Sequence, residues 1–496
     1  MSFWSRMANV LRGRSLNRQI DEELQSHIAE AIEQGRDPAE ARRAFGFALR
    51  LREESRDVKL IPWLDSLRAD TVFGWRQLAK SKVTSMAAML SLALGIGACT
   101  SAFRLIDALL LRPLPIAGPE RLYVISRRSS APGWKARAGE GCEYPLFRQM
   151  RAAVKGQAEL IAIAGAWPAD LTYGSQQEME KARWNYVSGW MFGSFGLRPA
   201  LGRLFTENDD LKPGAHPYAV LSHDYWTRRF GQDPNVIGRA FRMGSDLYTI
   251  VGVAEERFTG TEPGTVTDIF VPTMMNASVD KPQTSWFRAF ALLQPGVAAG
   301  PVRDRLHATF HAYQEERAKH TVGWSKQALD GLVNMTLSLE PAATGVSSMK
   351  KNYGTSLTAL GVLVALVLLI ASANVANLMT AQAAARAREM ALRVSIGAGR
   401  WRLVQLVLVE SAWLALFASA IGGAFAWWSA PLVVSRINPP DNPARLFLPG
   451  DWRVLGFGLA LALGVTLLFG LAPALRASAV QPARSRAERT RTPGAA

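Results

Sequence analysis

Residues that could carry out covalent or metal chemistry are scarce in this sequence, and their spacing forms no catalytic set. His307 and His311 in HATFH lie four residues apart, on one face of an expected helix. A zinc site would need a third ligand, and the metalloprotease pattern H-E-x-x-H would need a glutamate after the first histidine. We therefore interpret both histidines as polar-face residues. We expect no catalytic site, no metal site and no bound cofactor in this chain.

The sequence also contains no G-x-x-x-x-G-K-[ST] run. In many ATP-binding proteins the backbone amides of that loop hold the phosphates. We therefore expect that the chain is not an enzyme. Any ATP-driven step would then depend on a separate subunit.

Arginines are concentrated in the segment Gln382–Trp401, between two apolar stretches. Its AAARARE core favours a helix, and Gly397 and Gly399 allow a turn after it. A short, basic, helix-prone segment can insert into a groove of a cytoplasmic partner and pass on displacement. The alternative is that these arginines only fix the orientation of the chain in a membrane, and the two roles are compatible. The candidate contact residues are Arg386, Arg388, Glu389, Arg393, Gly397 and Arg400.

A few polar residues lie inside or at the ends of apolar stretches. Arg104 and Asp107 are three residues apart, so on a helix they can form an ion pair near the end of the first stretch. Glu410 lies early in the third stretch, where it is a functional candidate, a residue that reaches the interface, or a partner of a nearby arginine such as Arg402. Asn374 and Asn377 are candidates for hydrogen bonds between helices.

Four long apolar stretches must position these residues. A bilayer core of roughly 30 Å needs about 20 apolar residues in a helix. Three of the stretches hold such a run without any charged residue, and the third in order is interrupted only by Glu410. We predict transmembrane helices over residues 83–112, 353–380, 403–434 and 454–475.

The formal net charge of +16 is explained by basic residues beside these stretches. Short basic segments adjoin the cytoplasmic ends of membrane helices. Such segments precede the first stretch, form the loop 381–402 and form the tail 476–496, so we place these three, and both chain ends, in the cytoplasm. Residues 113–352 and the short loop 435–453 then lie outside. A nucleic-acid partner is not expected, because it would need a solvated basic surface.

The remaining sequence divides into two parts. Residues 1–82 have the spacing of short amphipathic helices, which would form a small cytoplasmic appendage or a docking module for a partner. Residues 113–352 contain short β-branched and aromatic runs bounded by Gly and Pro, alternating with helical patterns, which indicates an α+β domain. The stretch from about Trp184 to Met274 is a candidate inserted subdomain. Because Cys142 is the only cysteine there, we expect no internal disulfide.

The segment Ala373–Gly423 resembles the FtsX-like permeases, in which R-E-x-A-L-R-x-x-x-G-A is followed by Q-x-x-x-x-E. The matching residues are Arg388, Glu389, Ala391, Leu392, Arg393, Gly397, Ala398, Gln405 and Glu410. The stretch VSGWMFGSFGLRPALGRLFTENDD is similar to MacB-type periplasmic domains. The leader DEELQSHIAEAIEQGRDPAEARRAFG resembles that of the acidobacterial duplicated orphan permeases, of which this chain resembles the first half alone.

The resemblance implies a membrane α-helical protein with four spans and a large α+β periplasmic domain between the first two. It implies a permease subunit of a type VII, or mechanotransmission, ABC system of the bacterial inner membrane, used for efflux or other envelope work. The implied partners are a cytoplasmic ABC ATPase docked on the 381–402 loop, a second permease copy or paralogue, a periplasmic adaptor and membrane lipid. The alternative is a membrane-anchored receptor or regulator without transport. A membrane-tethered hydrolase would need a nucleophile motif that the sequence does not offer.

Overall fold

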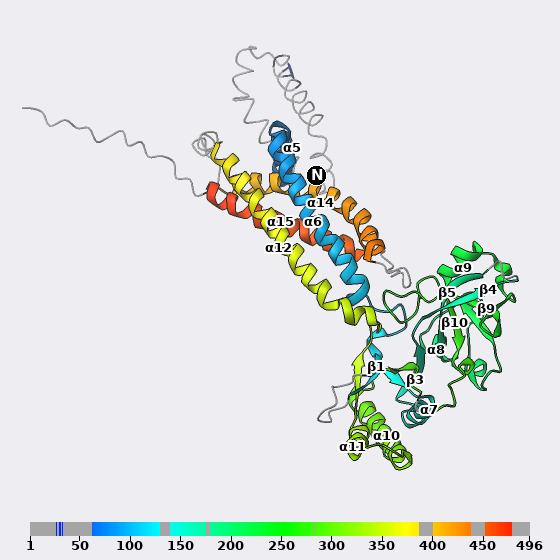
Figure 1. Ribbon diagram of the computed structural model, residues 1–496. Helices are drawn as coiled ribbons and strands as arrows, with labels where there is room; N and C mark the ends of the chain where they lie inside the picture. The colour runs from blue at the N-terminus through cyan, green and yellow to red at the C-terminus, as the bar shows by residue number, and fades with distance from the viewer. Residues whose placement is uncertain are drawn as a thin grey trace, which may run out of the picture. The chain divides into compact units, whose positions relative to one another are not determined.

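The computed structural model describes residues 62–128, 139–174, 179–282, 284–385, 400–437 and 452–478, together with positions 26, 29, 30 and 32. The chain forms two compact units, which are described separately (Figure 1). The first comprises residues 1–101, 362–428 and 450–496, and the second comprises residues 102–361 and 429–449. Most of the predicted prefix 1–82 lies outside the described residues.

The described part of the first unit is helical. Its helices are α5 (Pro62–Lys80), α6 (Lys82–Ile106), α12 (Ser348–Ala385), α14 (Arg400–Ile437) and α15 (Trp452–Ser478), and α6, α12 and α14 continue into the second unit. The stretches 82–111, 348–382 and 404–433 are long and apolar enough to cross a membrane. They coincide with three of the four predicted spans. In α15 the apolar stretch among the described residues is the shorter 452–468, so a fourth span stays a prediction.

Glycines let α6 pack closely against α12 and α14. A Cβ atom at Gly97 would lie 2.9 Å from the carbonyl oxygen of Gly422 and 2.8 Å from the ring of Phe425 on α14. A Cβ atom at Gly95 would lie 2.9 Å from the side chain of Leu368 on α12. Small residues favour such approaches in membranes, where association depends on packing because lipid removes the hydrophobic driving force between helices.

Helix α5 packs against α14. The indole N–H of Trp413 donates a hydrogen bond to the carbonyl oxygen of Thr71 at 3.1 Å. The ring of Trp75 lies 5.9 Å from the ring of Trp413 and 5.5 Å from that of Phe417. The last part of the predicted prefix is therefore packed within the helical unit.

The second unit is an α+β domain built on one 12-stranded sheet, in agreement with the sequence prediction of an α+β fold. The strand order is β10-β7-β9-β8-β4-β5-β3-β11-β1-β12, with β2 on β11 and β6 on β9. The strands are β1 (Leu122–Arg128), β2 (Gly141–Cys142), β3 (Ala158–Ala164), β4 (Trp167–Thr172), β5 (Met179–Val187), β6 (Pro199–Gly202), β7 (Tyr218–Leu221), β8 (Ala240–Met243), β9 (Asp246–Ala254), β10 (Ile269–Pro272), β11 (Phe287–Leu293) and β12 (Thr336–Pro341). The helices are α7 (Tyr144–Ala153), α8 (Met191–Ser194), α9 (His223–Phe230), α10 (Ala299–His320) and α11 (Lys326–Val333).

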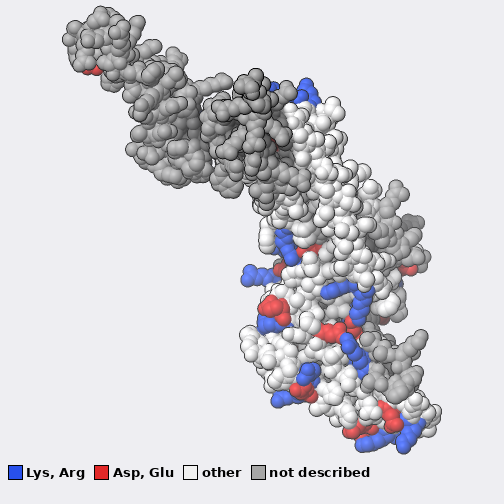
Figure 2. All heavy atoms as spheres, turned by 90° about the vertical axis from the view of Figure 1, so that its left-hand side faces the viewer, with Lys and Arg blue, Asp and Glu red and all other residues white. Residues whose placement is uncertain are grey.

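Alternation along the strands produces cores on both faces of this sheet. On β3, Leu160 and Ala162 face a core that α7 and α10 cover, whereas Ile161 and Ile163 face a second core that α8 joins. A third core forms under α9 around β5, β7, β9 and β10. Cys142 is buried and free. On the visible face of this unit, basic and acidic side chains are interspersed (Figure 2).

The candidate inserted subdomain is wider than the sequence suggested. Strands β3 and β11 pair antiparallel over seven residues, 158–164 with 287–293. The strands that lie between β3 and β11 in sequence form the other end of the sheet. The first of them is β4, which begins at Trp167, before the expected start of the subdomain at Trp184. The two ends of the sheet meet at β3 and β5, whose ladder consists of one residue pair, Ile163 with Val187.

The glycine contact between α6 and α14 yields the first prediction. Replacing Gly97 or Gly422 by leucine should lower the free energy of unfolding by about 2 kcal/mol, because the added side chain must displace the facing backbone. The measurement is thermal unfolding of the full chain in detergent. Gly423→Leu is the matched control, since a Cβ atom there meets no described atom within 4 Å. An equal loss of stability in all three variants would contradict close packing at Gly97.

Candidate functional site

The end of α6 changes from α-helical to π-helical geometry over Asp107–Leu111. The backbone N–H of Arg112 closes this turn by donating to the carbonyl oxygen of Asp107 at 2.7 Å. Its guanidinium also donates to the carboxylate of Asp107, at 3.0 and 3.3 Å. Such turns are rare and often mark functional positions. The ion pair fixes the point where the chain leaves the first predicted span.

The beginning of α12 packs against this end of α6 within the second unit. A Cβ atom at Gly361 would lie 3.1 Å from the side chain of Ile106, and one at Gly354 would lie 3.7 Å from that of Leu110. The two helices that flank the α+β domain in sequence are therefore in contact where they reach it.

The loop 259–267, between β9 and β10, packs on both of these helix ends. A Cβ atom at Gly264 would lie 2.5 Å from the sulfur of Met349 on α12 and 3.3 Å from Leu109, and its φ of +87° also favours glycine. The backbone N–H of Val346 donates to the carbonyl oxygen of Thr261 at 3.1 Å. We call this loop, the π-helical turn and the first turn of α12 the junction.

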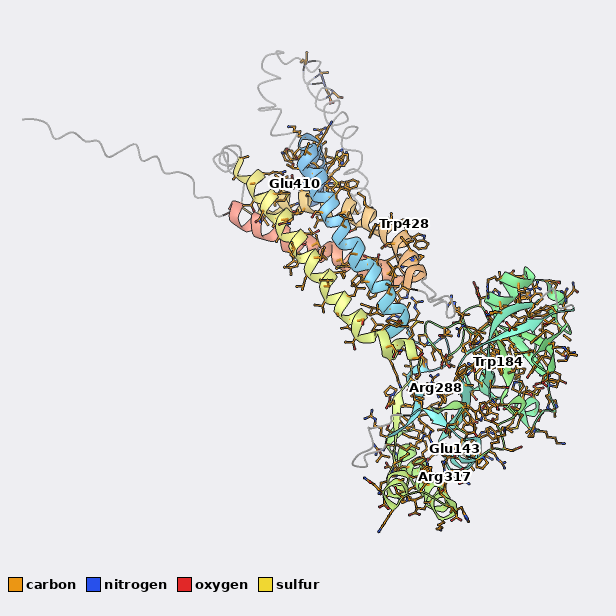
Figure 3. The ribbon with its side chains drawn as sticks, in the orientation of Figure 1. Glu143, Trp184, Arg288, Arg317, Glu410 and Trp428 are labelled. Atoms are coloured by element: carbon orange, nitrogen blue, oxygen red, sulfur yellow. The ribbon has the colours of Figure 1, made fainter. Side chains whose placement is uncertain are left out.

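A buried ion network ties the junction to the sheet. Arg288 lies on β11 (Figure 3). It donates to Glu140 at 2.8 Å and also to Glu262 in the junction loop. Lys351 on α12 donates to Glu140 as well. Glu262 accepts a further hydrogen bond from the backbone N–H of Ala166 at 3.4 Å. The guanidinium of Arg288 thus joins two carboxylates that are distant in sequence, and these in turn bind Lys351 and the backbone of Ala166.

Burial alone would disfavour the charged form of Arg288. The two carboxylates outweigh that effect and raise its pKa above the ordinary value. The exposed fractions are 21% for Arg288, 10% for Glu140 and 12% for Glu262. The carboxylates are therefore largely withdrawn from water, and their repulsion is offset by the shared guanidinium.

A second buried pair fixes α10 to the start of α7. The carboxylate of Glu143 is 3% exposed and accepts from Arg317 at 2.8 Å (Figure 3). The hydroxyl of Tyr313 donates to the same carboxylate at 3.3 Å, and burial, followed by the charge of Glu143, raises the pKa of Tyr313. These contacts hold the helical layer of the domain in place.

The charged candidates within the predicted membrane helices are buried. Arg104 and Asp107 both lie at the end of α6, and Glu410 lies on α14. One partner of Asp107 is Arg112, which the sequence analysis did not consider. A pair between Arg104 and Asp107 stays a prediction.

The other candidates lie at exposed or undescribed positions. Asn374 and Asn377 are exposed on α12, whereas Val375 and Met379 between and beyond them are buried. Hydrogen bonds from these asparagines across helices stay a prediction. Arg386, Arg388, Glu389, Arg393 and Gly397 lie outside the described residues, and Arg400 is the first residue of α14.

His307 and His311 lie on α10, as the helical spacing predicted. Their rings are 6.4 Å apart, and Nδ1 of His311 is 3.5 Å from the carboxylate of Glu315. This places both on the surface of an amphipathic helix.

Sequence reasoning missed the Arg288 network because its members are far apart along the chain. One signal was available: Arg288 lies inside the apolar run FRAFALL, where a charge needs a buried partner. The identity of Glu140, Glu262 and Lys351 as those partners depends on the sheet register and on the path of the junction loop.

Arg288→Gln should destabilise the α+β domain by about 3 kcal/mol, because it leaves two buried carboxylates without their cation. Thermal unfolding of the full chain in detergent measures the effect. Arg128→Gln is the control: Arg128 and Glu340 form an exposed pair, 63% and 37% accessible, whose loss should cost less than about 1 kcal/mol. A similar loss of stability in both variants would contradict the conclusion that Arg288 compensates two buried carboxylates.

Two protein-family models match parts of this chain. The MacB-like periplasmic core domain matches residues 85–309, and the FtsX-like permease C-terminal domain matches residues 361–482. The macrolide export ATP-binding/permease protein MacB of Escherichia coli K12 is 24% identical over 429 residues, which are 82% of this chain and 59% of that protein. The MacB of Shigella flexneri is 23% identical over the same shares. The chain thus spans 59% of the length of these relatives.

Two solved structures are similar to part of this chain. A permease-protein domain from Porphyromonas gingivalis has 16% identity and a TM-score of 0.35, and it covers 46% of this chain and 91% of that one. The periplasmic region of MacB from Actinobacillus actinomycetemcomitans has 11% identity and a TM-score of 0.29, with shares of 43% and 87%. The two family matches, together with the MacB relatives, the apolar helices and the α+β domain, identify the chain as an ABC transporter permease of the FtsX/MacB type.

Proposed function

We propose that this chain is the permease subunit of a type VII, or mechanotransmission, ABC system. In this proposal a separate cytoplasmic ATPase moves the membrane helices, and the helices move the periplasmic α+β domain for export or other envelope work. The junction is the observation that carries the proposal. Both flanking helices end on one loop, and Lys351 on α12 is linked through Glu140 to Arg288 in the sheet.

The close packing of the membrane helices supports this proposal. A displacement is passed on efficiently only between elements that cannot slide freely past one another. Gly95 and Gly97 bring α6 against the backbones of α12 and α14, and Gln382 on α12 donates to Thr84 on α6 at 2.8 Å. An aqueous path through the bilayer would need more polar side chains than these apolar stretches carry.

In the proposal, the ATPase acts on the membrane helices through the loop 381–402. Its arginines would dock on the ATPase, with both chain ends in the cytoplasm and the α+β domain in the periplasm. The MacB relatives are named as ATP-binding proteins as well as permeases. This sequence holds no G-x-x-x-x-G-K-[ST] run. In the proposal ATP is therefore bound by a partner chain. A second permease copy or paralogue and a periplasmic adaptor complete the assembly.

Reversing the charge of the loop tests the proposal. Arg388→Glu with Arg393→Glu should abolish co-purification of a co-expressed ATPase and reduce ATP hydrolysis in nanodiscs to that of the ATPase alone, because the basic contacts would become repulsive. Membrane insertion should be unchanged. The matched control is Lys155→Glu with Lys212→Glu, which makes the same change of net charge at exposed positions of the second unit.

Two results would contradict the proposal. One is full ATPase association by the loop variant. The other is a wild-type chain that associates with no ATPase while its α+β domain still recruits periplasmic partners, which would favour the receptor or regulator alternative.

A further inference from the structure

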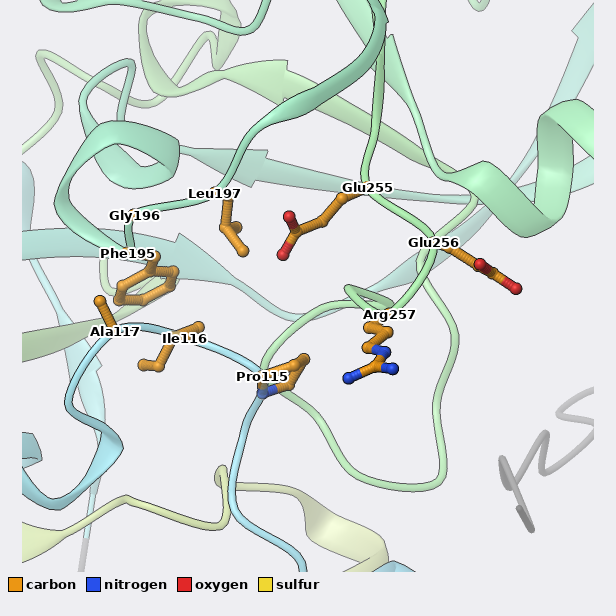
Figure 4. A pocket seen from close by; sticks show the side chains of 9 residues that line it. All are labelled: Pro115, Ile116, Ala117, Phe195, Gly196, Leu197, Glu255, Glu256 and Arg257. Atoms are coloured by element: carbon orange, nitrogen blue, oxygen red, sulfur yellow. The ribbon is translucent and has the colours of Figure 1, made fainter. Parts of the chain in front are cut away.

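An open pocket of about 610 Å³ lies in the second unit, beside the segment that follows α6 (Figure 4). Three chain segments line it: Pro115–Ala117, Phe195–Leu197 and Glu255–Arg257. The first two segments are joined by a hydrogen bond from the backbone N–H of Ala117 to the carbonyl oxygen of Phe195 at 2.8 Å. The backbone N–H of Arg198 donates weakly to Glu255 at 3.5 Å, so the walls are held in place without a ligand.

The pocket has one apolar side and one charged side. Ile116, Phe195 and Leu197 form the apolar side, and Phe195 and Leu197 are themselves part of a buried core. On the charged side, the half-buried carboxylate of Glu255 points toward the apolar side, and the guanidinium of Arg257 points toward Pro115 (Figure 4). Glu256 points away from both in the same view. A fitting ligand would carry a cation, an anion and an apolar part.

Chain length places this pocket close to the membrane surface. The first apolar stretch ends at Leu111, and Pro115 follows it by four residues. Four residues span at most about 14 Å even when fully extended. The headgroup region extends roughly 5–8 Å beyond the hydrocarbon core on each side. Pro115 therefore lies at the level of the headgroups or at most roughly 6–9 Å beyond them, so the pocket wall is near the headgroups.

We propose that the pocket binds the headgroup of phosphatidylethanolamine from the adjacent leaflet. The ammonium group pairs with Glu255, the phosphate pairs with Arg257, and the apolar part of the lipid lies against Ile116 and Leu197. Phosphatidylglycerol has no ammonium for Glu255. Phosphatidylcholine has a quaternary ammonium that cannot donate a hydrogen bond, so it loses the charge-assisted bond to the carboxylate.

The test is native mass spectrometry of the full chain, released from detergent after incubation with one of the three lipids. The wild type should retain phosphatidylethanolamine in preference to the other two. Glu255→Gln and Arg257→Gln should each reduce this retention about tenfold, the loss expected for one charge-assisted hydrogen bond. Ala117→Trp, at an exposed position of the wall, should reduce it by filling the pocket. Glu256→Gln is the matched control and should retain the lipid as the wild type does.

The proposal is overturned if all variants retain phosphatidylethanolamine equally, or if the wild type retains the three lipids equally, since both results indicate lipid bound elsewhere on the membrane helices. Soluble phosphoethanolamine distinguishes the source of the headgroup. If it binds with the same dependence on Glu255 while the lipid does not bind, the lipid assignment is wrong. This test needs no ATPase, so its outcome is independent of the proposed coupling function.

Discussion

The organisation of the second unit depends on the pairing of charges that folding withdraws from water. Glu140 and Glu262 come from segments more than a hundred residues apart, and the guanidinium of Arg288 lies between them and pairs with both carboxylates. Because Lys351 shares Glu140, the same cluster fixes the first turn of α12. The cost of burying these charges is offset only when the sheet, the loop 259–267 and the helix are all in place. The cluster therefore selects one arrangement of the junction.

Local sequence patterns predicted the parts of the structure that depend on local rules. Apolar length predicted the spans at 83–112, 353–380 and 403–434, since a helix in lipid must satisfy its own backbone. β-branched runs such as LYTIVGVA predicted strands, and β9 contains that run. Alternating strand and helix patterns predicted the α+β domain. In each case the signal lies within one segment and needs no knowledge of its neighbours.

The functional features that sequence reasoning missed depend on contacts between distant segments. The sequence analysis did not consider Arg112 as a partner of Asp107, because only the π-helical turn brings its guanidinium, five residues ahead, onto that carboxylate. Position 97 requires glycine because the backbone of Gly422 on α14 lies opposite it, and this contact is known only from the structure. The pocket is formed by residues near positions 116, 196 and 256, which are brought together by the pairing of β6 with β9 and by the hydrogen bond from Ala117 to Phe195. The arginines of the loop 381–402 were selected from their composition; those before Arg400 lie outside the described residues, and their role stays a prediction.

The one-pair ladder between β3 and β5 has a mechanical consequence. The membrane-flanking helices attach to both ends of the sheet: through Arg288 to β11 at one end, and through the loop after β9 to the other. A long ladder between those ends would resist bending along its whole length. Here the ends are joined by one residue pair, by the hydrogen bond from the backbone N–H of Ser188 to the carbonyl oxygen of Ala162, and by the buried core that Ile163 and Phe270 share. In the proposed mechanism α6 and α12 would move together, and a small displacement passed on through these two attachments would tilt one end of the sheet against the other.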